Sequence, residues 1–191
     1  MLLPIVALLA VLYSPHDMQR LSNGEILTWV KDSTESYCRV TTSGVIVASI
    51  ERVWALVTDF ANYPRLYPGI GRSEVRKRNG DTVWGYFLLN FPWPLPSRWT
   101  LNETRLHPEQ FSFDWVCQEG TIKRYDGRLQ LQNLGNNRTL LEFEAVMDPG
   151  FNFIPAWLVT HVHKFVLPAI ITNVREYLAT GADVAASEIV R

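Results

Sequence analysis

The segment FSFDWVC, residues 111–117, alternates large apolar residues with smaller or polar ones. Its odd-numbered positions hold three aromatic residues and a cysteine, and its even-numbered positions hold serine, aspartate and valine. Side chains of a β-strand point alternately to the two faces of the sheet. The segment therefore predicts a strand that turns Phe113 and Trp115 toward a core and Asp114 toward water.

Similar strand patterns precede and follow this segment. The turn signal Asn79-Gly80-Asp81 separates two of them, and His107-Pro108 and Glu119-Gly120 interrupt the pattern farther along. Short turns between consecutive strands favour antiparallel pairing. The sequence predicts a meander of about seven strands, at residues 37–48, 73–77, 82–89, 98–106, 110–118, 121–134 and 139–147.

Two helical patterns are available to cover the apolar face of this sheet. The first follows Ser49, an N-cap residue type, and its apolar stripe consists of Ile50, Val53, Trp54, Val57 and Phe60. The second covers residues 155–179, where Pro168 is expected to kink the helix. The predicted fold class is α+β, with a curved antiparallel sheet wrapped around a long C-terminal helix.

A sheet that grips a helix encloses either a packed core or a ligand chamber, and aromatic and methionine side chains suit both. Strand parity is clear at residues 111–147 and less clean at residues 82–89, where both faces are apolar. The candidate ligand-binding residues are Trp84, Tyr86, Trp99, Leu101, Glu103, Arg105, Phe113, Trp115, Tyr125, Phe143, Met147, Trp157, His161 and Phe165.

Three of these candidates are polar, and a ligand pocket needs a few oriented polar groups among apolar walls. Glu103 and Arg105 share the parity of Trp99. They form an ion pair near the chamber if Trp99 faces inward, and otherwise they lie past the edge of the covered face. His161 lies on the apolar stripe of the last helix, where a histidine either contacts a ligand or is hydrogen-bonded in place.

Composition and motifs exclude several classes of function. Apolar residues make up 47% of the chain and the net charge is −1, which indicates a folded protein without the basic field that nucleic-acid binding requires. The sequence contains no nucleophile elbow, phosphate-binding loop, dinucleotide fingerprint or zinc-protease motif, so neither a catalytic residue nor a cofactor is predicted. His161 and His163 diverge on a helix, and Cys38 and Cys117 lack metal-ligand spacing, so no metal site is predicted. The cysteines are expected to be separate thiols, although an exported protein would allow a disulfide.

Residues 1–13 are nearly all apolar but too few for an ordinary transmembrane helix. Their length suits a secretory signal, yet no Lys or Arg precedes them and no A-x-A site follows. Residues 1–16 are therefore either a signal-like or anchoring segment of an exported, periplasmic or membrane-anchored protein, or a buried helix of a cytoplasmic one. The folded domain is expected at residues 17–181, with a tail at 182–191.

Three stretches in this order resemble one known family: IERVWALVTDFANYPRLYPGI at 50–70, PWPLPSRWT at 92–100, and DPGFNFIPAWLVTHVHKFVLPAIITNVREYL at 148–178. They are similar to a helix, a proline-rich loop and the closing helix of START-type lipid-transfer domains. These domains belong to the helix-grip (SRPBCC) superfamily, which also holds polyketide cyclases. The resemblance implies a hydrophobic tunnel beneath the C-terminal helix, a mobile loop over its entrance and a lipid or sterol as ligand, and it does not imply an enzyme. Trp99 and Phe151 depart from the family pattern, so the ligand is not narrowed further.

The proline-rich stretch FPWPLPSRWT, residues 91–100, cannot lie within a central strand because proline lacks a backbone donor. We predict that Trp93, Arg98, Phe151 and Phe153 form a gate at the chamber entrance that dips into a bilayer interface, where indoles are favoured. The alternative is that these residues seal one end of the core.

Three functions remain open at this point. The first is a monomeric, non-enzymatic carrier of a lipid or another hydrophobic molecule, with transient membrane contact. The second is a cyclase or aromatase of polyketide-like substrates, in which Arg98, Glu103 or His161 orients an enolate. The third is a partner-binding module with a closed core.

Overall fold

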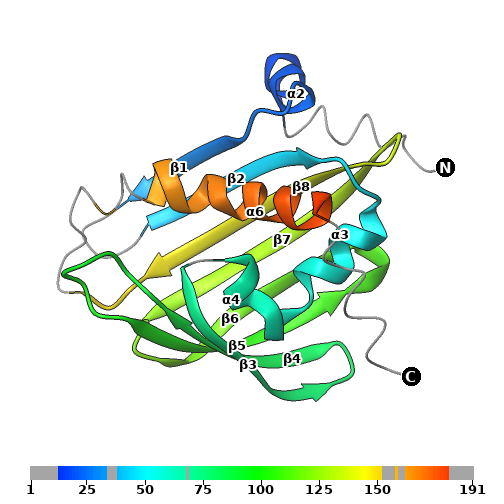
Figure 1. The fold of residues 1–191 in the computed structure, drawn as a ribbon. Helices are drawn as coiled ribbons and strands as arrows, with labels where there is room; N and C mark the ends of the chain where they lie inside the picture. The colour runs from blue at the N-terminus through cyan, green and yellow to red at the C-terminus, as the bar shows by residue number, and fades with distance from the viewer. Residues whose placement is uncertain (1–12, 34–37, 68, 152–157, 159–161, 181–191) are drawn as a thin grey trace.

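An antiparallel sheet covered by helices forms the part of the chain that the computed structural model describes, which is residues 13–33, 38–67, 69–151, 158 and 162–180 (Figure 1). The strands are β1 (Leu27–Ser33), β2 (Cys38–Ile46), β3 (Ile70–Asn79), β4 (Thr82–Leu89), β5 (Arg98–His107), β6 (Ser112–Gly120), β7 (Arg124–Gly135) and β8 (Arg138–Asp148). The helices are α2 (Pro15–Ser22), α3 (Ile50–Val57), α4 (Tyr63–Leu66) and α6 (Leu167–Ala179). Two 3₁₀ turns, η1 (Phe60–Asn62) and η2 (Pro108–Gln110), and a π-helical turn, η3 (Val162–Val166), complete the described elements.

The described strands lie in the order β1-β2-β8-β7-β6-β5-β4-β3, and every neighbouring pair is antiparallel. Strands β3 to β8 form the expected meander, and β2 then pairs with β8. The α+β prediction of a curved sheet and a C-terminal helix is confirmed. Strand β1 is an additional edge strand that was not among the seven predicted strands.

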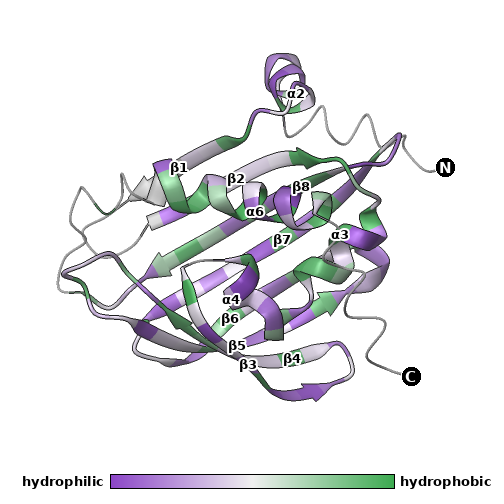
Figure 2. Ribbon diagram, in the orientation of Figure 1, coloured by the Kyte–Doolittle hydropathy of each residue, from purple (hydrophilic) through white to green (hydrophobic). Residues whose placement is uncertain are grey.

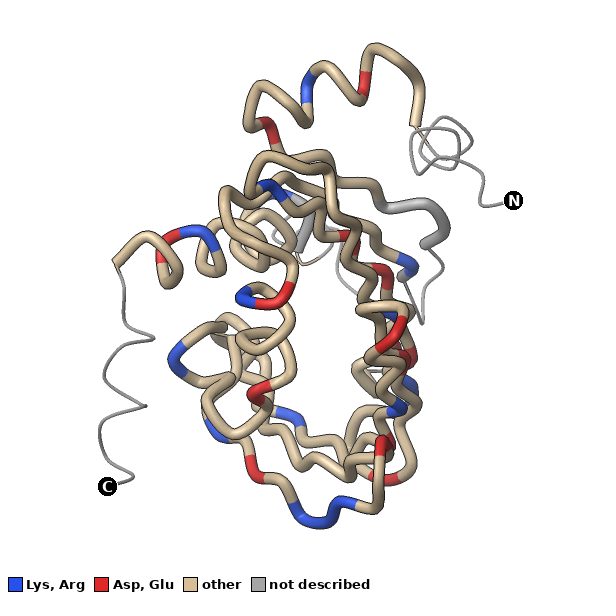
Figure 3. The backbone as a smooth tube through the Cα atoms, turned by 90° about the vertical axis from the view of Figure 1, so that its right-hand side faces the viewer, with Lys and Arg blue, Asp and Glu red and all other residues tan. Residues whose placement is uncertain are grey.

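Helices α3 and α6 cover the concave face of the sheet, which we call the inner face (Figures 1 and 3). The Ser49 hydroxyl accepts a hydrogen bond from the Arg52 backbone N–H at 3.4 Å, so Ser49 caps α3 as predicted. Helix α6 lies close against β2 because residue 44 is glycine. A Cβ atom at Gly44 would lie 2.6 Å from Cγ2 of Ile171, which is fully buried. Glycine therefore permits this contact between strand and helix.

The π-helical turn η3 runs directly into α6, with Pro168 in the first turn of α6. Proline cannot donate the backbone hydrogen bond that an α-helix needs at this position. A π turn holds more residues than an α-helical turn, so it rotates the side chains that precede the proline relative to those that follow it. The kink predicted at Pro168 stays a prediction. The structure shows a π turn before Pro168, which changes which side chains upstream of the proline face the sheet.

A second, smaller apolar cluster covers part of the opposite, outer face of the sheet. Leu21 of α2 packs there with Tyr13, Leu27, Val45 and Leu140. Hydrophobic and hydrophilic residues alternate along the strands, so the two faces can each contribute to a cluster (Figure 2). Helix α2 thus anchors the chain that precedes β1 against the outer face.

The predicted segment at residues 1–16 and the tail at 182–191 fall mainly or wholly outside the described residues. Among the helices that the structure describes, none is both long and apolar enough to cross a membrane. Pro15 and His16 belong to the short helix α2.

Candidate functional site on the inner face of the sheet

Trp115 lies at the centre of an aromatic cluster on the inner face. Its ring centroid is 5.4 Å from that of Phe143 in a stacked arrangement, 5.6 Å from Tyr125 and 5.9 Å from Phe113. These residues come from adjacent strands, and their shared parity turns them to the same face. The structure therefore places Phe113, Trp115, Tyr125 and Phe143 where the alternation predicted, while ligand contact by them stays a prediction.

Gly127 makes room for the indole of Trp115. The two residues are directly paired across β6 and β7, and a Cβ atom at Gly127 would lie 2.4 Å from Cζ2 of Trp115. Any larger residue at position 127 would displace the ring from the surface of β7. The flat orientation of Trp115 over the sheet therefore depends on this glycine.

The end of the inner face beneath α3 is closely packed. The rings of Trp54 in α3 and Phe111 pack edge to face with their centroids 6.0 Å apart. The rings of Phe60 and Phe113 do the same with their centroids 5.6 Å apart. Phe60 and Phe113 are buried. Aromatic pairs at these distances add to the stability gained from burial. This end of the inner face is core.

The opposite end of the inner face is more accessible. Tyr125 and Met147 are paired where β7 begins and β8 ends, and both are only half-buried although they point inward. Tyr67, which follows α4, is also half-buried. This end of the inner face is therefore more accessible than the end beneath α3.

Tyrosine hydroxyls supply the polar groups of this end. Tyr63 donates a hydrogen bond to the Val57 carbonyl at 2.7 Å, whereas within the described residues no hydrogen bond is recorded for the hydroxyls of Tyr67 and Tyr125. Burial raises the pKa of Tyr125 to about 12. It also raises the pKa of Tyr67 above the ordinary value, with a smaller contribution from nearby Tyr125. Both hydroxyls are therefore protonated at neutral pH and can donate a hydrogen bond.

Trp115 adds another polar group to the inner face. Its Nε1 atom is buried, and no hydrogen-bond acceptor is found for it among the described residues. Buried donors are nearly always paired, and an unpaired one is costly. An acceptor atom of a ligand or a water molecule would satisfy this indole N–H.

Six candidate ligand-binding residues of β4 and β5 face outward, so of the two positions considered for Glu103 and Arg105 the structure shows the one outside the covered face. Trp84 pairs with Glu103 and Tyr86 pairs with Leu101, and all four lie on the outer face, opposite buried Val83 and Phe87. The six outward residues are Trp84, Tyr86, Trp99, Leu101, Glu103 and Arg105.

Cations from β3 explain why the outer face of β4 resembles a core in sequence. Lys77 lies 4.9 Å from the ring centroid of Trp84, and Arg76 lies 5.3 Å from that of Tyr86, which stacks on Trp99. The charged groups of both residues lie over the aromatic rings, a cation–π arrangement that stabilises aromatic side chains on a solvent-facing surface. The side chains of Glu103 and Arg105 form an ion pair at 2.8 Å on this solvent-facing side.

Of the residues predicted to form a gate, Trp93, Arg98 and Phe151 are described and lie in or beside the loop at 90–97. Phe91 contacts Phe151 edge to face at 5.3 Å, and the Arg98 guanidinium lies 4.7 Å from the Phe151 ring. Arg98 also donates from Nε to the Pro149 carbonyl at 3.2 Å. These contacts hold the loop against residues 149–151. Trp93 at the tip of the loop does not pack with them, because 91% of its surface is exposed.

Three further predicted residues, Phe153, Trp157 and His161, lie outside the described residues. Phe165 is described and is 61% exposed, so the prediction that it faces the chamber is wrong. Phe165 belongs to the π turn η3, whose wider geometry breaks the α-helical periodicity assumed for it. The residues that follow Pro168 keep the predicted stripe, since Ile171, Val174 and Leu178 are buried.

The sequence pattern did not select Tyr63 and Tyr67 as site residues. Tyr63 is the first residue of α4 and Tyr67 directly follows that helix, and only the tertiary fold brings them near Tyr125. The Pro68 that follows Tyr67 gave no indication of which way the tyrosine points.

Metal ligands and a disulfide are not part of the described site. No group of His, Cys, Asp or Glu suited to a metal ion occurs among the residues that the structure describes. Cys117 is a free thiol on the inner face, and the Thr100 hydroxyl lies 3.1 Å from its sulfur. Strands β8 and β7 separate the strands of Cys38 and Cys117 in the sheet, too far for a disulfide bridge.

The fold agrees with comparisons against known proteins. A family model described as polyketide cyclase / dehydrase and lipid transport matches residues 46–175, more than half of the chain. The chain belongs to this polyketide cyclase and lipid-transport family. A search of the curated proteins by sequence finds no match.

Solved structures of lipid-transfer and cyclase proteins share the fold of this family member. The STAR-related lipid transfer protein from Xanthomonas axonopodis aligns with a TM-score of 0.66 at 17% identity, over 81% of this chain and 93% of that one. Human STARD10 aligns with a TM-score of 0.70 at 12% identity, over 86% and 73% of the two chains. The ZhuI aromatase/cyclase from Streptomyces sp. R1128 aligns with a TM-score of 0.61 at 13% identity, over 74% and 96%. These TM-scores establish a shared START-type helix-grip fold.

Proposed function

We propose that this protein binds a hydrophobic, lipid- or sterol-like ligand between the inner face of the sheet and α6, as a carrier without catalytic activity. The accessible end of the inner face carries this proposal. There the half-buried side chains of Tyr67, Tyr125 and Met147 adjoin the aromatic surface of Trp115 and Phe143. Apolar walls with a few oriented donors are typical of small-molecule sites.

The chemistry of the inner face favours a carrier over an enzyme. The described inner-face side chains of strands β4 to β8 include hydroxyl, thiol, amide and indole groups but no carboxylate and no imidazole. General acid–base catalysis needs a group whose pKa lies near the working pH. Burial moves the pKa of Tyr125 to about 12, away from that range. These donors are suited to orient one polar end of a ligand.

Ligand exchange in this proposal takes place at the loop 90–97. Trp93 is almost fully exposed at its tip, and the contacts of Phe91 and Arg98 with Phe151 hold the loop at the same end as Tyr125 and Met147 (Figure 1). Exposed indoles partition into the interfacial region of a bilayer. A transient insertion of Trp93 would bring the accessible end of the inner face to the membrane surface.

Native mass spectrometry of the purified protein, followed by organic extraction, tests the proposal. We expect one chemically unmodified lipid or sterol per chain. An empty protein that also takes up no labelled lipid would contradict the proposal and favour a partner-binding module with a closed core. Conversion of a polyketide-like substrate by the protein would contradict it in favour of a cyclase.

Transfer of labelled lipid between liposomes tests the role of Trp93. We expect Trp93→Ala to slow transfer while the protein still retains ligand, because the side chain lies outside the inner face. Trp84→Ala, which removes an indole from the outer face of β4, is the control and should transfer at the rate of the unmodified protein. Equal rates for Trp93→Ala and the unmodified protein would remove Trp93 from the exchange step.

A further inference from the structure

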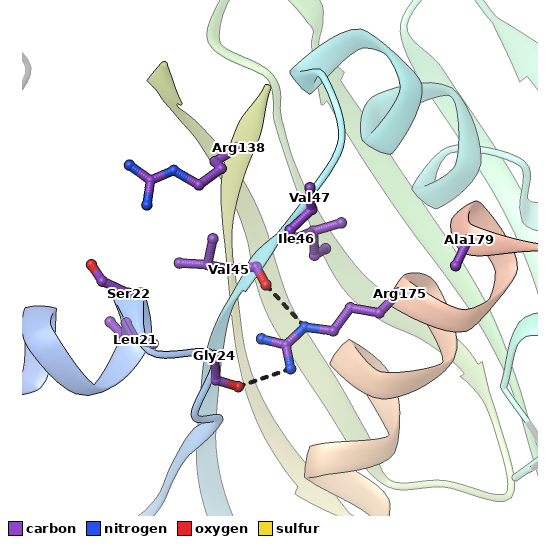
Figure 4. A pocket seen from close by; sticks show the side chains of 9 residues that line it. All are labelled: Leu21, Ser22, Gly24, Val45, Ile46, Val47, Arg138, Arg175 and Ala179. Atoms are coloured by element: carbon purple, nitrogen blue, oxygen red, sulfur yellow. Dashed lines mark hydrogen bonds between the residues drawn. The ribbon is translucent and has the colours of Figure 1, made fainter. Parts of the chain in front are cut away.

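A separate pocket lies at the edge of the sheet, next to the C-terminal end of β2, which is not paired with β1. Its volume is about 330 Å³, and α2, β2, β8 and α6 each contribute to its walls (Figure 4). Leu21, Val45, Val47 and Ala179 give it apolar walls. Its charged members are two arginines, Arg138 at the start of β8 and Arg175 on α6.

Arg175 is held in place by the backbone. Its Nε donates to the Val45 carbonyl at 2.9 Å, and Nη1 donates to the Gly24 carbonyl at 3.0 Å (Figure 4). These bonds orient the third nitrogen, Nη2, toward the pocket, where it is buried without a hydrogen-bond acceptor among the described residues. Burial also lowers the pKa of Arg175. The guanidinium is therefore fixed in position while part of its hydrogen-bonding capacity is unused.

Arg138 approaches the same pocket from the outer face. Its Nε atom is buried and likewise has no acceptor in the described part of the chain. No ion pair with a carboxylate is recorded there for either arginine, and the nearby acids have other partners. Glu25 pairs with Arg20 at 2.9 Å, and Glu142 accepts hydrogen bonds from Tyr13 and Gln132.

A second pocket of similar size shows the ordinary arrangement. It measures about 310 Å³ on the surface of β2, β7 and β8, and it also contains arginines. There Arg39 lies 2.9 Å from Glu144, and Arg124 lies 2.7 Å from Asp126. Two of its three arginines are thus paired with carboxylates, and the third, Arg128, donates a hydrogen bond to Gln130 at 2.9 Å. The pocket of Arg138 and Arg175 differs because neither of its arginines has such a carboxylate partner among the described residues.

We propose that the pocket of Arg138 and Arg175 binds an anionic phosphate or carboxylate group, either free or as the head group of an amphiphile. The anion would pair with the charge of the two guanidinium groups, and a shift of either side chain would bring it to Arg175 Nη2 or Arg138 Nε, the two buried donors that lack partners. Hydrogen bonds between a guanidinium and an oxyanion are among the stronger ones in proteins. Val47, which is 77% exposed, offers apolar contact to the chain of an amphiphile. This site is independent of the ligand proposed for the inner face.

Two probes distinguish the source of the anion. Isothermal titration calorimetry at low salt measures binding of inorganic phosphate, and co-sedimentation measures binding to vesicles of phosphatidylglycerol against vesicles of phosphatidylcholine. We expect Arg138→Gln and Val47→Asp to weaken binding by about tenfold or more, because the first removes a charged donor and the second adds a competing carboxylate. Arg124→Gln, in the second pocket, is the matched control and should bind as the unmodified protein does.

Each outcome decides a point. Phosphate binding that depends on Arg138 supports the site with a free anion as its ligand. Binding to phosphatidylglycerol alone, with the same dependence, supports an amphiphile head group. Absence of both, or binding that Arg138→Gln and Val47→Asp leave unchanged, overturns the proposal. Arg175→Gln is less useful, since it also removes two structural hydrogen bonds.

Discussion

Replacement of Gly127 by alanine tests whether this glycine positions Trp115 in the inner-face cluster. The added methyl group would lie 2.4 Å from Cζ2 of Trp115 and 2.4 Å from the main-chain oxygen of Glu144. Atoms in favourable contact are about 3.5 to 4 Å apart, so each neighbour would have to move by about 1 Å. Neither can move easily, because the oxygen belongs to the β7–β8 pairing and the indole is packed among Phe113, Tyr125 and Phe143.

The expected change in stability is the balance of two opposed effects. Overpacking of a filled site costs about 1 to 3 kcal/mol, and the rigidity of both neighbours places Gly127→Ala toward the upper end. Loss of glycine freedom in the unfolded chain returns about 0.4 to 1 kcal/mol. We therefore expect Gly127→Ala to lower the free energy of unfolding by about 1 to 2 kcal/mol, as the difference of these two effects.

Urea denaturation followed by circular dichroism measures this difference as a shift of the midpoint at constant slope. Gly69→Ala is the matched control, since no atom lies within 4 Å of its added methyl group. It should be neutral or slightly stabilising. In a Trp115→Phe background the cost of Gly127→Ala should fall, because phenylalanine lacks the outer indole atoms. A Gly127→Ala protein as stable as Gly69→Ala would refute the reasoning.

Three other predictions concern charge, helix phase and ligand orientation. Burial raises the pKa of Glu142 in the folded protein above its ordinary value. The folded protein therefore binds this proton more tightly than the unfolded chain does. The stability from this proton binding is present below the unfolded pKa and is lost as pH rises through the folded pKa. Glu142→Gln should therefore flatten the pH dependence of the unfolding midpoint in that range, and an unchanged slope would contradict this reading. Ile171→Ala should destabilise by about 2 to 5 kcal/mol, whereas Phe165→Ala should change the midpoint little, and comparable losses would show that η3 does not turn Phe165 to solvent. Tyr125→Phe should weaken retention of a ligand with a polar end but not of a pure hydrocarbon, measured by competitive displacement, and equal losses would remove the hydroxyl from the site.

The sequence indicated which side faces inward for some strands of the sheet but not for others. At residues 111–115 and 141–145, aromatic or aliphatic residues alternate with serine, aspartate or glutamate, so the side that faces the core is evident from the sequence. On β4 both faces are apolar, because the outward rings of Trp84 and Tyr86 are covered by Lys77 and Arg76 from β3. The turn between β5 and β6 determines which residues of β5 face inward. It pairs Leu106 with Phe113, and this pairing sets Leu106, rather than Arg105, on the inner face.

By itself, the sequence determined the α+β class, the antiparallel meander, the Ser49 helix start and the inward side of β6 to β8, because all of these depend on local periodicity and turn chemistry. Only the tertiary structure decided where Phe165 points, since the phase of a helix across Pro168 depends on how η3 meets the sheet. It also brought Tyr67 toward Tyr125 and placed Arg138 and Arg175 around one pocket. These groups are far apart in the chain, and their proximity follows from the pairing of strands and the packing of α6, which no local pattern specifies.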